Sequence, residues 1–251
     1  MNGLTVLILA AESGVKQERW TSPSAPKQLI SVRGETLLGR TLRLLEERGV
    51  SQPWLLTASE ALARYPVLSW CPLQRDTKAH SLLSADALVG CGGLLVLYSD
   101  VYYSEAAIAK ILACEDTHFY GRDGRSAYTF KDYGELFAVR IAADDRERAR
   151  LALLDAIAFY QRTGNQSFWA FYRLMAGLPL DDNKAIERRI FVDVHDETDD
   201  IDFAEEVPLL LAAIDKPLGW RVRHLLRRLS LANKRRRERA RTSAVKAASL
   251  A

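Results

Sequence analysis

Residues 4–9 read Leu-Thr-Val-Leu-Ile-Leu, and this run decides the fold. It is continuous, apolar and of strand length, as expected for a parallel strand that is buried on both faces. A similar run occupies residues 94–98. Around these two runs, segments with strand patterns alternate with segments whose apolar residues have helical spacing. Strands are predicted at 54–58, 117–120, 127–130, 135–141 and 189–194, and helices at 35–48, 81–89, 105–113, 145–162, 166–176 and 203–214. The alternation predicts an α/β fold of Rossmann-like type, a mainly parallel mixed sheet with helices on both faces.

The composition is that of an ordinary globular protein. The chain has 251 residues, of which 48% are hydrophobic and 27% charged, so it can form one large domain with a sizeable core. No apolar run approaches the roughly 20 residues that span a bilayer. The three cysteines, Cys71, Cys91 and Cys114, lie far apart without a CxxC pair. This excludes a disulfide framework and a cysteine-rich zinc site, and it favours a cytoplasmic location.

The net charge of +3 hides two oppositely charged parts of the chain. Residues 216–251 contain twelve Lys and Arg against one acid, a net charge of +11, whereas the preceding 215 residues carry a net charge of −8. Lys216-Pro217 marks the change in composition. We therefore divide the chain into a body, residues 1–215, and a basic tail, residues 216–251, that are expected to have different partners.

The tail has the pattern of a basic amphipathic helix. Apolar residues from Trp220 to Leu231 alternate with arginines, and a basic run follows at 234–239. Such a helix can lie on an anionic membrane surface, which would place the protein peripherally at the inner membrane surface. An inert, solvated tail is the main alternative. Nucleic-acid binding is unlikely, because nothing else in the chain supports it.

Three polar segments follow predicted strands, where ligands of parallel sheets bind. The segment after Leu9, together with Lys27, suits a polyphosphate, although an ordinary loop with a solvated lysine is an alternative. Asp100 follows the strand at 94–98 after Ser99, and it is either solvated at the sheet edge or binds a metal, for which Mg²⁺ is suited. Ser104 is better placed than Asp100 to cap the next helix. The acidic run at 193–202 requires either a counter-cation or full solvation, and Asp202 could also cap the following helix.

The order of these motifs resembles the nucleotidyltransferase family with the glycosyltransferase-A type fold. The resemblance covers about residues 3–212 and rests on the following segments: Leu9-Ala10-Ala11-x-x-Gly14-x-Lys16, Pro26-Lys27-Gln28-Leu29, Gly34-Glu35-Thr36-Leu37-Leu38, Asp100 and Asp200-Ile201-Asp202. It implies the glycosyltransferase-A type fold. It also implies Mg²⁺-dependent transfer of a nucleoside monophosphate from an NTP to a small phosphorylated acceptor, with release of pyrophosphate. The last motif and the segment 131–138 are similar to the phosphocholine cytidylyltransferase-like branch, so CTP is the favoured donor.

The resemblance also implies roles for individual residues. The acceptor would be a phosphocholine-like alcohol phosphate or a sugar phosphate, and the product a precursor of envelope polysaccharides. The implied residues are, for catalysis, Lys27, Asp100 and Asp202; for Mg²⁺, Asp100, Asp200 and Asp202; for the nucleotide, Leu9, Ala10, Ala11, Ser13, Gly14, Lys16 and Ser81; and for the acceptor, Lys131 and Glu135.

Two departures from the family pattern leave other functions open. Glu12 stands where the family has a glycine, and Lys16 where it has an arginine. A glutamate in this loop puts negative charge near a triphosphate, and lysine loses the bidentate fork of arginine. The alternatives are therefore a catalytically silent nucleotide-binding relative and a glycosyltransferase that uses Asp100 with a nucleotide-sugar. Lys27 and its motif favour transfer from an NTP.

Several aromatic and histidine side chains have simpler interpretations. Trp169, Phe171 and Tyr172 lie in a predicted helix and are expected in the core, with a pocket for a cationic acceptor as the lesser alternative. His80 is close to the implied base site, but a structural role is the stronger expectation.

Overall fold

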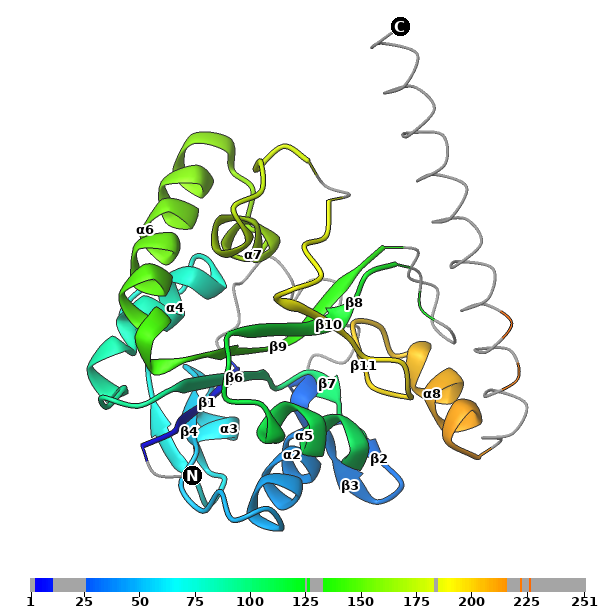
Figure 1. Ribbon diagram of the computed structural model, residues 1–251. Helices are drawn as coiled ribbons and strands as arrows, with labels where there is room; N and C mark the ends of the chain where they lie inside the picture. Colours follow the sequence, from blue (N-terminus) through cyan, green and yellow to red (C-terminus); the bar gives the residue numbers. More distant parts are fainter. Residues whose placement is uncertain are drawn as a thin grey trace, which may run out of the picture.

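A seven-stranded mixed sheet forms the centre of the molecule (Figure 1). The computed structural model describes residues 3–10, 26–124, 126, 133–182, 185–215, 222 and 226. The sheet has the order β10-β8-β9-β6-β1-β4-β5, and β9 is antiparallel to both of its neighbours while the other pairs are parallel. The strands are β1 (Thr5–Leu9), β4 (Trp54–Leu56), β5 (Leu68–Trp70), β6 (Leu94–Tyr98), β8 (His118–Arg122), β9 (Glu135–Ile141) and β10 (Phe191–Asp193). The predicted α/β class with a mainly parallel mixed sheet is confirmed.

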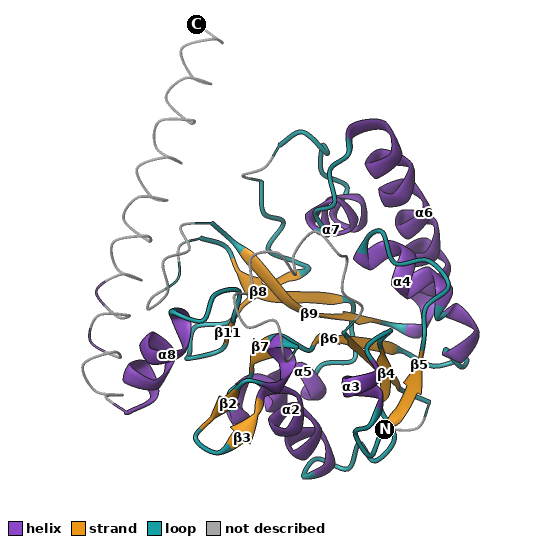
Figure 2. Ribbon diagram, turned by 180° about the vertical axis from the view of Figure 1, so that it is seen from behind, coloured by secondary structure: helices purple, strands orange, loops and turns teal. Residues whose placement is uncertain are grey.

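Helices cover both faces of this sheet. In Figure 1 one group lies above the sheet and another below it, and Figure 2 shows the same two layers from behind. The first group is α4 (Lys78–Ser84), α6 (Arg146–Thr163) and α7 (Trp169–Ala176), and the second is α2 (Leu37–Glu46), α3 (Glu60–Ala63) and α5 (Glu105–Ala113). In the first group α6 packs against both α4 and α7. Helix α8 (Glu206–Asp215) lies to one side of the sheet (Figure 1).

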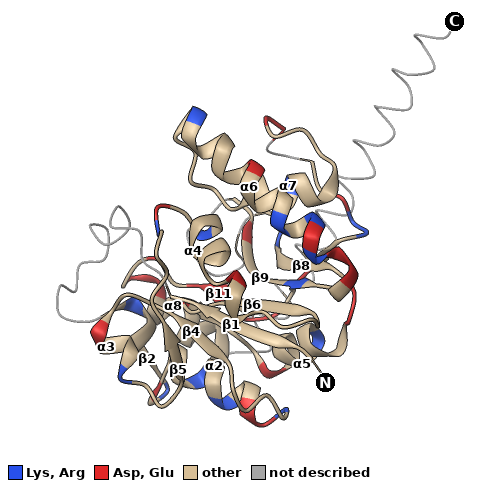
Figure 3. Cartoon of the chain, turned by 90° about the vertical axis from the view of Figure 1, so that its left-hand side faces the viewer, with Lys and Arg blue, Asp and Glu red and all other residues tan. Residues whose placement is uncertain are grey.

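The two apolar runs found in the sequence are the middle of the core. β1 and β6 pair in parallel with Leu7 opposite Val96, and all five side chains of β6 are buried. Fully burying one such aliphatic side chain contributes roughly 1.5–3 kcal/mol, so these strands fix the sheet. The strands β1, β4 and β6 contain no charged residue and are drawn in tan in Figure 3.

Side-chain caps set the start of three helices. Thr36, Thr77 and Ser104 each accept a hydrogen bond from a backbone N–H in the first turn, of α2, α4 and α5 respectively. The prediction of a helix over 81–89 was wrong at both ends. Because Thr77 accepts from the N–H of His80, the helix begins at Lys78, and it ends at Ser84 before a separate 3₁₀ turn, η2 (Asp86–Leu88).

The sequence patterns missed the shortest elements. These are the hairpin of β2 (Ser31–Val32) and β3 (Glu35–Thr36), the strand β5, the helix α3, and an antiparallel ribbon of β7 (Val101–Tyr102) and β11 (Asp199–Asp200). Two to four residues are too few for a detectable hydrophobic period. The predicted strand at 127–130 lies outside the described residues.

The helices of the described part of the chain include none that is long and apolar enough to span a bilayer. The predicted basic helix lies outside the described residues, except for Val222 and Leu226, which are exposed.

Candidate active site

The short ribbon of β7 and β11 brings two of the predicted acids together. Asp200 pairs with Val101 and Asp199 with Tyr102, and the N–H of Ile201 donates to the carbonyl of Asp100 at 2.9 Å. In this antiparallel register the residue before β7 and the residues after β11 lie at the same end of the ribbon. Asp100 and Asp202 therefore meet, although they are far apart in the chain.

Lys27 joins these two carboxylates. Its Nζ lies 2.5 Å from Asp100 Oδ2 and 3.0 Å from Asp202 Oδ1. Lys27 is the first residue of the 3₁₀ turn η1 (Lys27–Leu29) and contacts both acids with a largely buried side chain. The sequence motif around Lys27 thus reaches the ends of β6 and β11.

The charges in this group hold one another ionised. Burial alone would lower the pKa of Lys27, but the charges of Asp100 and Asp202 outweigh it and hold that pKa above its ordinary value. Burial alone would raise the pKa of Asp100, but Lys27, with a smaller effect of Lys78, lowers it to about 2. At neutral pH an ammonium therefore lies between two carboxylates.

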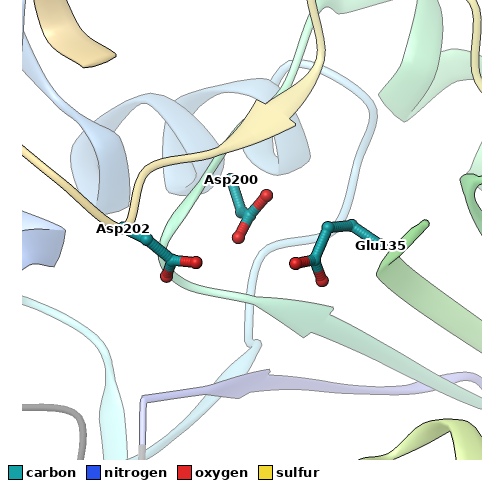
Figure 4. A group of neighbouring side chains, drawn as sticks. All are labelled: Glu135, Asp200 and Asp202. Atoms are coloured by element: carbon teal, nitrogen blue, oxygen red, sulfur yellow. The ribbon is translucent and has the colours of Figure 1, made fainter. Parts of the chain in front are cut away.

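A second group of acids shares Asp202. Glu135, Asp200 and Asp202 each offer a carboxylate oxygen, and these oxygens lie within 4.8 Å of one another. Figure 4 shows the three side chains turned toward a common point, from the start of β9 and from the end of β11. Carboxylate oxygens are the ligands that Mg²⁺ prefers, so this group fits that ion chemically. The structure thus groups Glu135 with two members of the predicted metal set, and connects the third, Asp100, to Asp202 through Lys27.

The acidic run at 193–202 is not simply a solvated loop. Asp199 and Asp200 are only 1% and 7% exposed. Asp196 accepts from the hydroxyl of Ser104 at 2.6 Å, and Asp199 accepts from Arg122 at 3.2 Å. These contacts assign Asp196 and Asp199 to holding the chain in place, and leave Asp200 and Asp202 at the candidate site.

Glu206 fixes the backbone at Asp202. Its fully buried side chain accepts hydrogen bonds from the N–H of Asp202 at 2.8 Å and of Phe203 at 3.2 Å. The alternative that Asp202 caps a helix starting at Phe203 was wrong, because α8 starts at Glu206 and Glu206 reaches back instead. The carboxylate of Asp202 instead accepts from Lys27.

Lys78 is a residue of this site that the sequence analysis missed. It is the first residue of α4, its Nζ lies 3.6 Å from the centroid of the Tyr98 ring, and its charge helps to lower the pKa of Asp100. A lysine in the first turn of a helix faces the positive end of the helix dipole. That unfavourable position was the available signal that Lys78 serves something other than the helix.

The predicted nucleotide residues are only partly within the described chain. The carbonyl of Leu9 accepts from both the N–H and the hydroxyl of Ser99, and the N–H of Ala10 donates to Leu56. Ser81 is buried, and its hydroxyl donates to the carbonyl of Thr77. The remaining predicted site residues lie outside the described parts of the chain: Ala11, Ser13, Gly14, Lys16 and Lys131. Glu12 lies outside them as well.

The aromatic residues of α7 belong mainly to the core, as expected. Phe171 and Tyr172 are fully buried and pack against Phe119, with ring centroids 5.4 and 5.2 Å apart. His80 is also buried, and its Nδ1 lies 2.9 Å from the hydroxyl of Thr77. These contacts give His80 a structural role.

Comparison with known proteins gives similarity in structure alone. No protein-family model matches the chain, and no curated protein matches it. CTP:phosphocholine cytidylyltransferase from Streptococcus pneumoniae is similar with a TM-score of 0.53 at 14% identity, over 84% of this chain and 99% of that one. For UDP-glucose pyrophosphorylase from Acinetobacter baumanii the TM-score is 0.54 at 14% identity, over 90% and 99% of the two chains.

A third solved structure extends this similarity to a different acceptor. For 2-C-methyl-D-erythritol 4-phosphate cytidylyltransferase from Thermus thermophilus the TM-score is 0.51 at 15% identity, over 83% of this chain and 97% of that one. At these identities the likeness is one of fold. The chain has the glycosyltransferase-A type fold of the nucleotidyltransferases, and the resemblance inferred from the sequence motifs is confirmed at that level.

Proposed function

We propose that this protein is a Mg²⁺-dependent nucleotidyltransferase. It transfers a nucleoside monophosphate, with CMP favoured, from an NTP to a small phosphorylated acceptor and releases pyrophosphate. The observation that carries the proposal is the position of Lys27 between Asp100 and Asp202 at the carboxyl end of β6. Lys27 is largely buried and is held in place by the two acids, and a preorganised positive charge of this kind can stabilise the transition state of a phosphoryl-type transfer.

The chemistry needs positioning and charge more than covalent catalysis. An oxygen of the acceptor phosphate attacks the α-phosphorus in line, a new P–O bond forms, and the bond to the bridging oxygen of pyrophosphate breaks. Lys27 would stabilise the negative charge that builds up on the phosphates. Asp100, Asp200 and Asp202 would hold Mg²⁺, and the bound ion would neutralise phosphate charge.

The nucleotide and acceptor would occupy neighbouring parts of the same sheet edge. We assign the nucleotide to the segment from Leu9 to Lys16 and to Ser81, and the acceptor to Lys131 and Glu135. The place of Glu135 beside Asp200 supports an acceptor near the metal set. The preference for CTP rests on the Asp200-Ile201-Asp202 motif, and the fold likeness to two cytidylyltransferases is compatible with it.

A donor and acceptor panel tests this function. The protein is incubated with Mg²⁺, with each common NTP in turn, and with phosphocholine, methylerythritol phosphate or glucose 1-phosphate, while pyrophosphate is followed. We expect release with CTP and one acceptor class, and none after chelation of the metal. Nucleotide binding without pyrophosphate release would favour the silent relative. Release of a nucleoside diphosphate from a nucleotide-sugar would favour the glycosyltransferase.

We also propose that the tail, residues 216–251, is a separate segment that attaches the body to an anionic membrane surface. Its net charge of +11 supports this assignment. An enzyme at the inner membrane surface would deliver an activated precursor where envelope polysaccharides are assembled.

A further inference from the structure

We infer that the buried ion pair of Arg122 and Asp199 is a positioning device for the candidate active site. It holds the hairpin that carries Glu135 against the strand that carries Asp200. The inference rests on the proposed function, because it assigns these two acids to the working site. Neither Arg122 nor Asp199 is expected to touch the substrates.

The carboxylate of Asp199 is the centre of this arrangement. Asp199 is 1% exposed, and its Oδ1 accepts from Arg122 Nη2 at 3.2 Å. Its Oδ2 accepts from the hydroxyl of Ser126 at 2.6 Å, and its Oδ1 also accepts from the N–H of Asp200 at 3.1 Å. Asp199 therefore binds the hairpin and the backbone of its own neighbour, Asp200, with the same carboxylate.

Arg122 fixes the other half of the arrangement. It is the last residue of β8 and stands opposite Glu135 in the register of β8 and β9. Its Nη1 donates to the carbonyl of Tyr133 at 2.7 Å and also to the carbonyl of Gly124. One planar guanidinium thus ties together both arms of the hairpin and, through Asp199, strand β11.

The backbone at Glu135 is packed too closely to tolerate a shift. The β8–β9 pairing is irregular between Tyr120 and Gly121, and a Cβ added at Gly121 would lie 2.1 Å from the carbonyl oxygen of Glu135. No side chain fits there, so the absence of a Cβ at Gly121 lets β9 approach at this point. The hairpin and the ion pair together determine where Glu135 enters the site.

A positioning role explains this pair better than stability does. Replacing a buried ion pair with apolar residues of similar volume is often neutral or stabilising, so such a pair is weak evidence for a contribution to stability. The planar guanidinium of Arg122 does, however, specify one relative placement of the strands, because one of its nitrogens binds Asp199 while another binds the carbonyls of Gly124 and Tyr133. Here that placement puts oxygens of Glu135 and Asp200 within 4.8 Å of one another.

Asp199→Asn tests the inference with little change of shape. Loss of residues that orient a metal or catalytic group commonly costs about 10–100-fold in activity, and we expect kcat for pyrophosphate release to fall by that amount. KM for the NTP should stay within about twofold, because the residues proposed to bind the triphosphate come from a different part of the sequence, 9–16. Arg122→Lys keeps the positive charge but loses the planar guanidinium. Its kcat should therefore lie between those of wild type and Arg122→Gln.

Thr117→Val is the matched control. Thr117 accepts from the N–H of Ala142 at 3.0 Å and so ties the same hairpin at its opposite end. At roughly 3.4 Å per residue, this contact lies more than 10 Å along the strands from Arg122. Loss of this buried hydrogen bond should lower Tm and leave kcat unchanged. If Asp199→Asn behaved in the same way, the pair would be merely structural and the inference would be wrong.

Crystal structures of wild type and of Asp199→Asn separate this inference from the proposed function. We expect the closest carboxylate oxygens of Glu135 and Asp200 to move apart beyond 4.8 Å in the variant. Unchanged positions would overturn the inference, whatever the activity. A wild-type protein that releases no pyrophosphate would overturn the proposed function, while the two structures would still decide the positioning role. Should Asp199→Asn fail to fold, the same two measurements on Arg122→Lys decide.

Discussion

Asp202 has two different neighbourhoods, and the difference between them divides the work of the site. On one side the ammonium of Lys27 lies between Asp202 and Asp100. On the other side the neighbours are the carboxylates of Asp200 and Glu135. The first side is built around a cation that belongs to the chain. The second collects the oxygen ligands that suit a cation from outside. Under the proposed function, a fixed lysine and an exchangeable metal would serve the same phosphates from adjacent positions.

Removing Asp100 should have the largest effect on the rate of pyrophosphate release. Asp100→Ala takes away the partner of Lys27 and a predicted metal ligand at once, so we expect pyrophosphate release to fall by about a thousandfold or more. The fold should persist, because the β7–β11 ribbon is paired through backbone groups. Circular dichroism and Tm check the fold. An active Asp100→Ala enzyme would refute the assignment.

Asp86→Ala is a matched control for this substitution. Asp86 is an exposed acid that pairs with Arg146 at 3.5 Å, on an element outside the candidate site. Its replacement should change neither kcat nor KM, since exposed ion pairs typically contribute at most about 1 kcal/mol.

Lys27→Ala should leave Asp202 with only carboxylate neighbours, because it removes the ammonium between Asp202 and Asp100. Loss of a preorganised charge should lower kcat by about a hundredfold. In the absence of nucleotide, the same variant should bind Mn²⁺ more tightly than wild type, because no ammonium competes for Asp100 and Asp202. Lys27→Arg keeps the charge and should bind Mn²⁺ as wild type does. A change in Tm with kcat and Mn²⁺ affinity unchanged would make Lys27 purely structural.

Glu135→Gln tests the second neighbourhood of Asp202, which contains Asp200 and Glu135. We expect KM for the phosphorylated acceptor to rise by about tenfold, in line with the loss of one charge-assisted hydrogen bond. Isothermal titration with Mn²⁺ should give an unchanged affinity if Glu135 serves the acceptor. A weaker Mn²⁺ affinity at an unchanged KM would instead make Glu135 a metal ligand.

The ion pair of Lys27 and Asp100 should contribute less to the free energy of unfolding as the pH falls through the acidic range. The pKa of Asp100 is lowered to about 2, so its stabilisation is present above its ordinary pKa and is lost as the pH falls toward 2. The pKa of Lys27 is raised, so its part persists up to its ordinary pKa and is lost only at higher pH. The free energy of unfolding of wild type, relative to Asp100→Asn, should therefore be constant from about pH 5 to 9 and decrease by about 2 kcal/mol below that range. Chemical denaturation across pH measures it, and a difference that grows on acidification would contradict it.

The apolar patterns predicted the framework better than the site. The helix expected at 105–113 and the strand expected at 135–141 are α5 and β9 as observed, because α5 buries one apolar face and β9 is a long run of buried residues. The convergence of Lys27, Asp100 and Asp202 followed from strand ends and motif order. The β7–β11 ribbon that produces it was missed because each strand has two residues.

The contacts around Glu135 could not be predicted from local patterns. Arg122 and Asp199 are 77 positions apart, and neither stands in a recognisable motif. Their pairing depends on how the hairpin packs against β11, and this packing is determined only by the tertiary structure. Lys78 was missed for a different reason, since the helix that it begins was predicted to start three residues later.

Removal of the tail should have the smallest effect on the candidate site. The core residues of the body lie at or before Ala213, and a net charge of +11 over residues 216–251 cannot be buried. A chain ending at residue 215 should therefore keep its Tm and its rate of pyrophosphate release. Its binding to anionic vesicles should weaken, because each basic residue near such a surface contributes on the order of 1 kcal/mol. The full chain's vesicle binding should decrease with salt, as screening requires. Equal vesicle binding with and without the tail would reject the membrane proposal, and salt-dependent binding to DNA or RNA alone would favour a nucleic-acid partner.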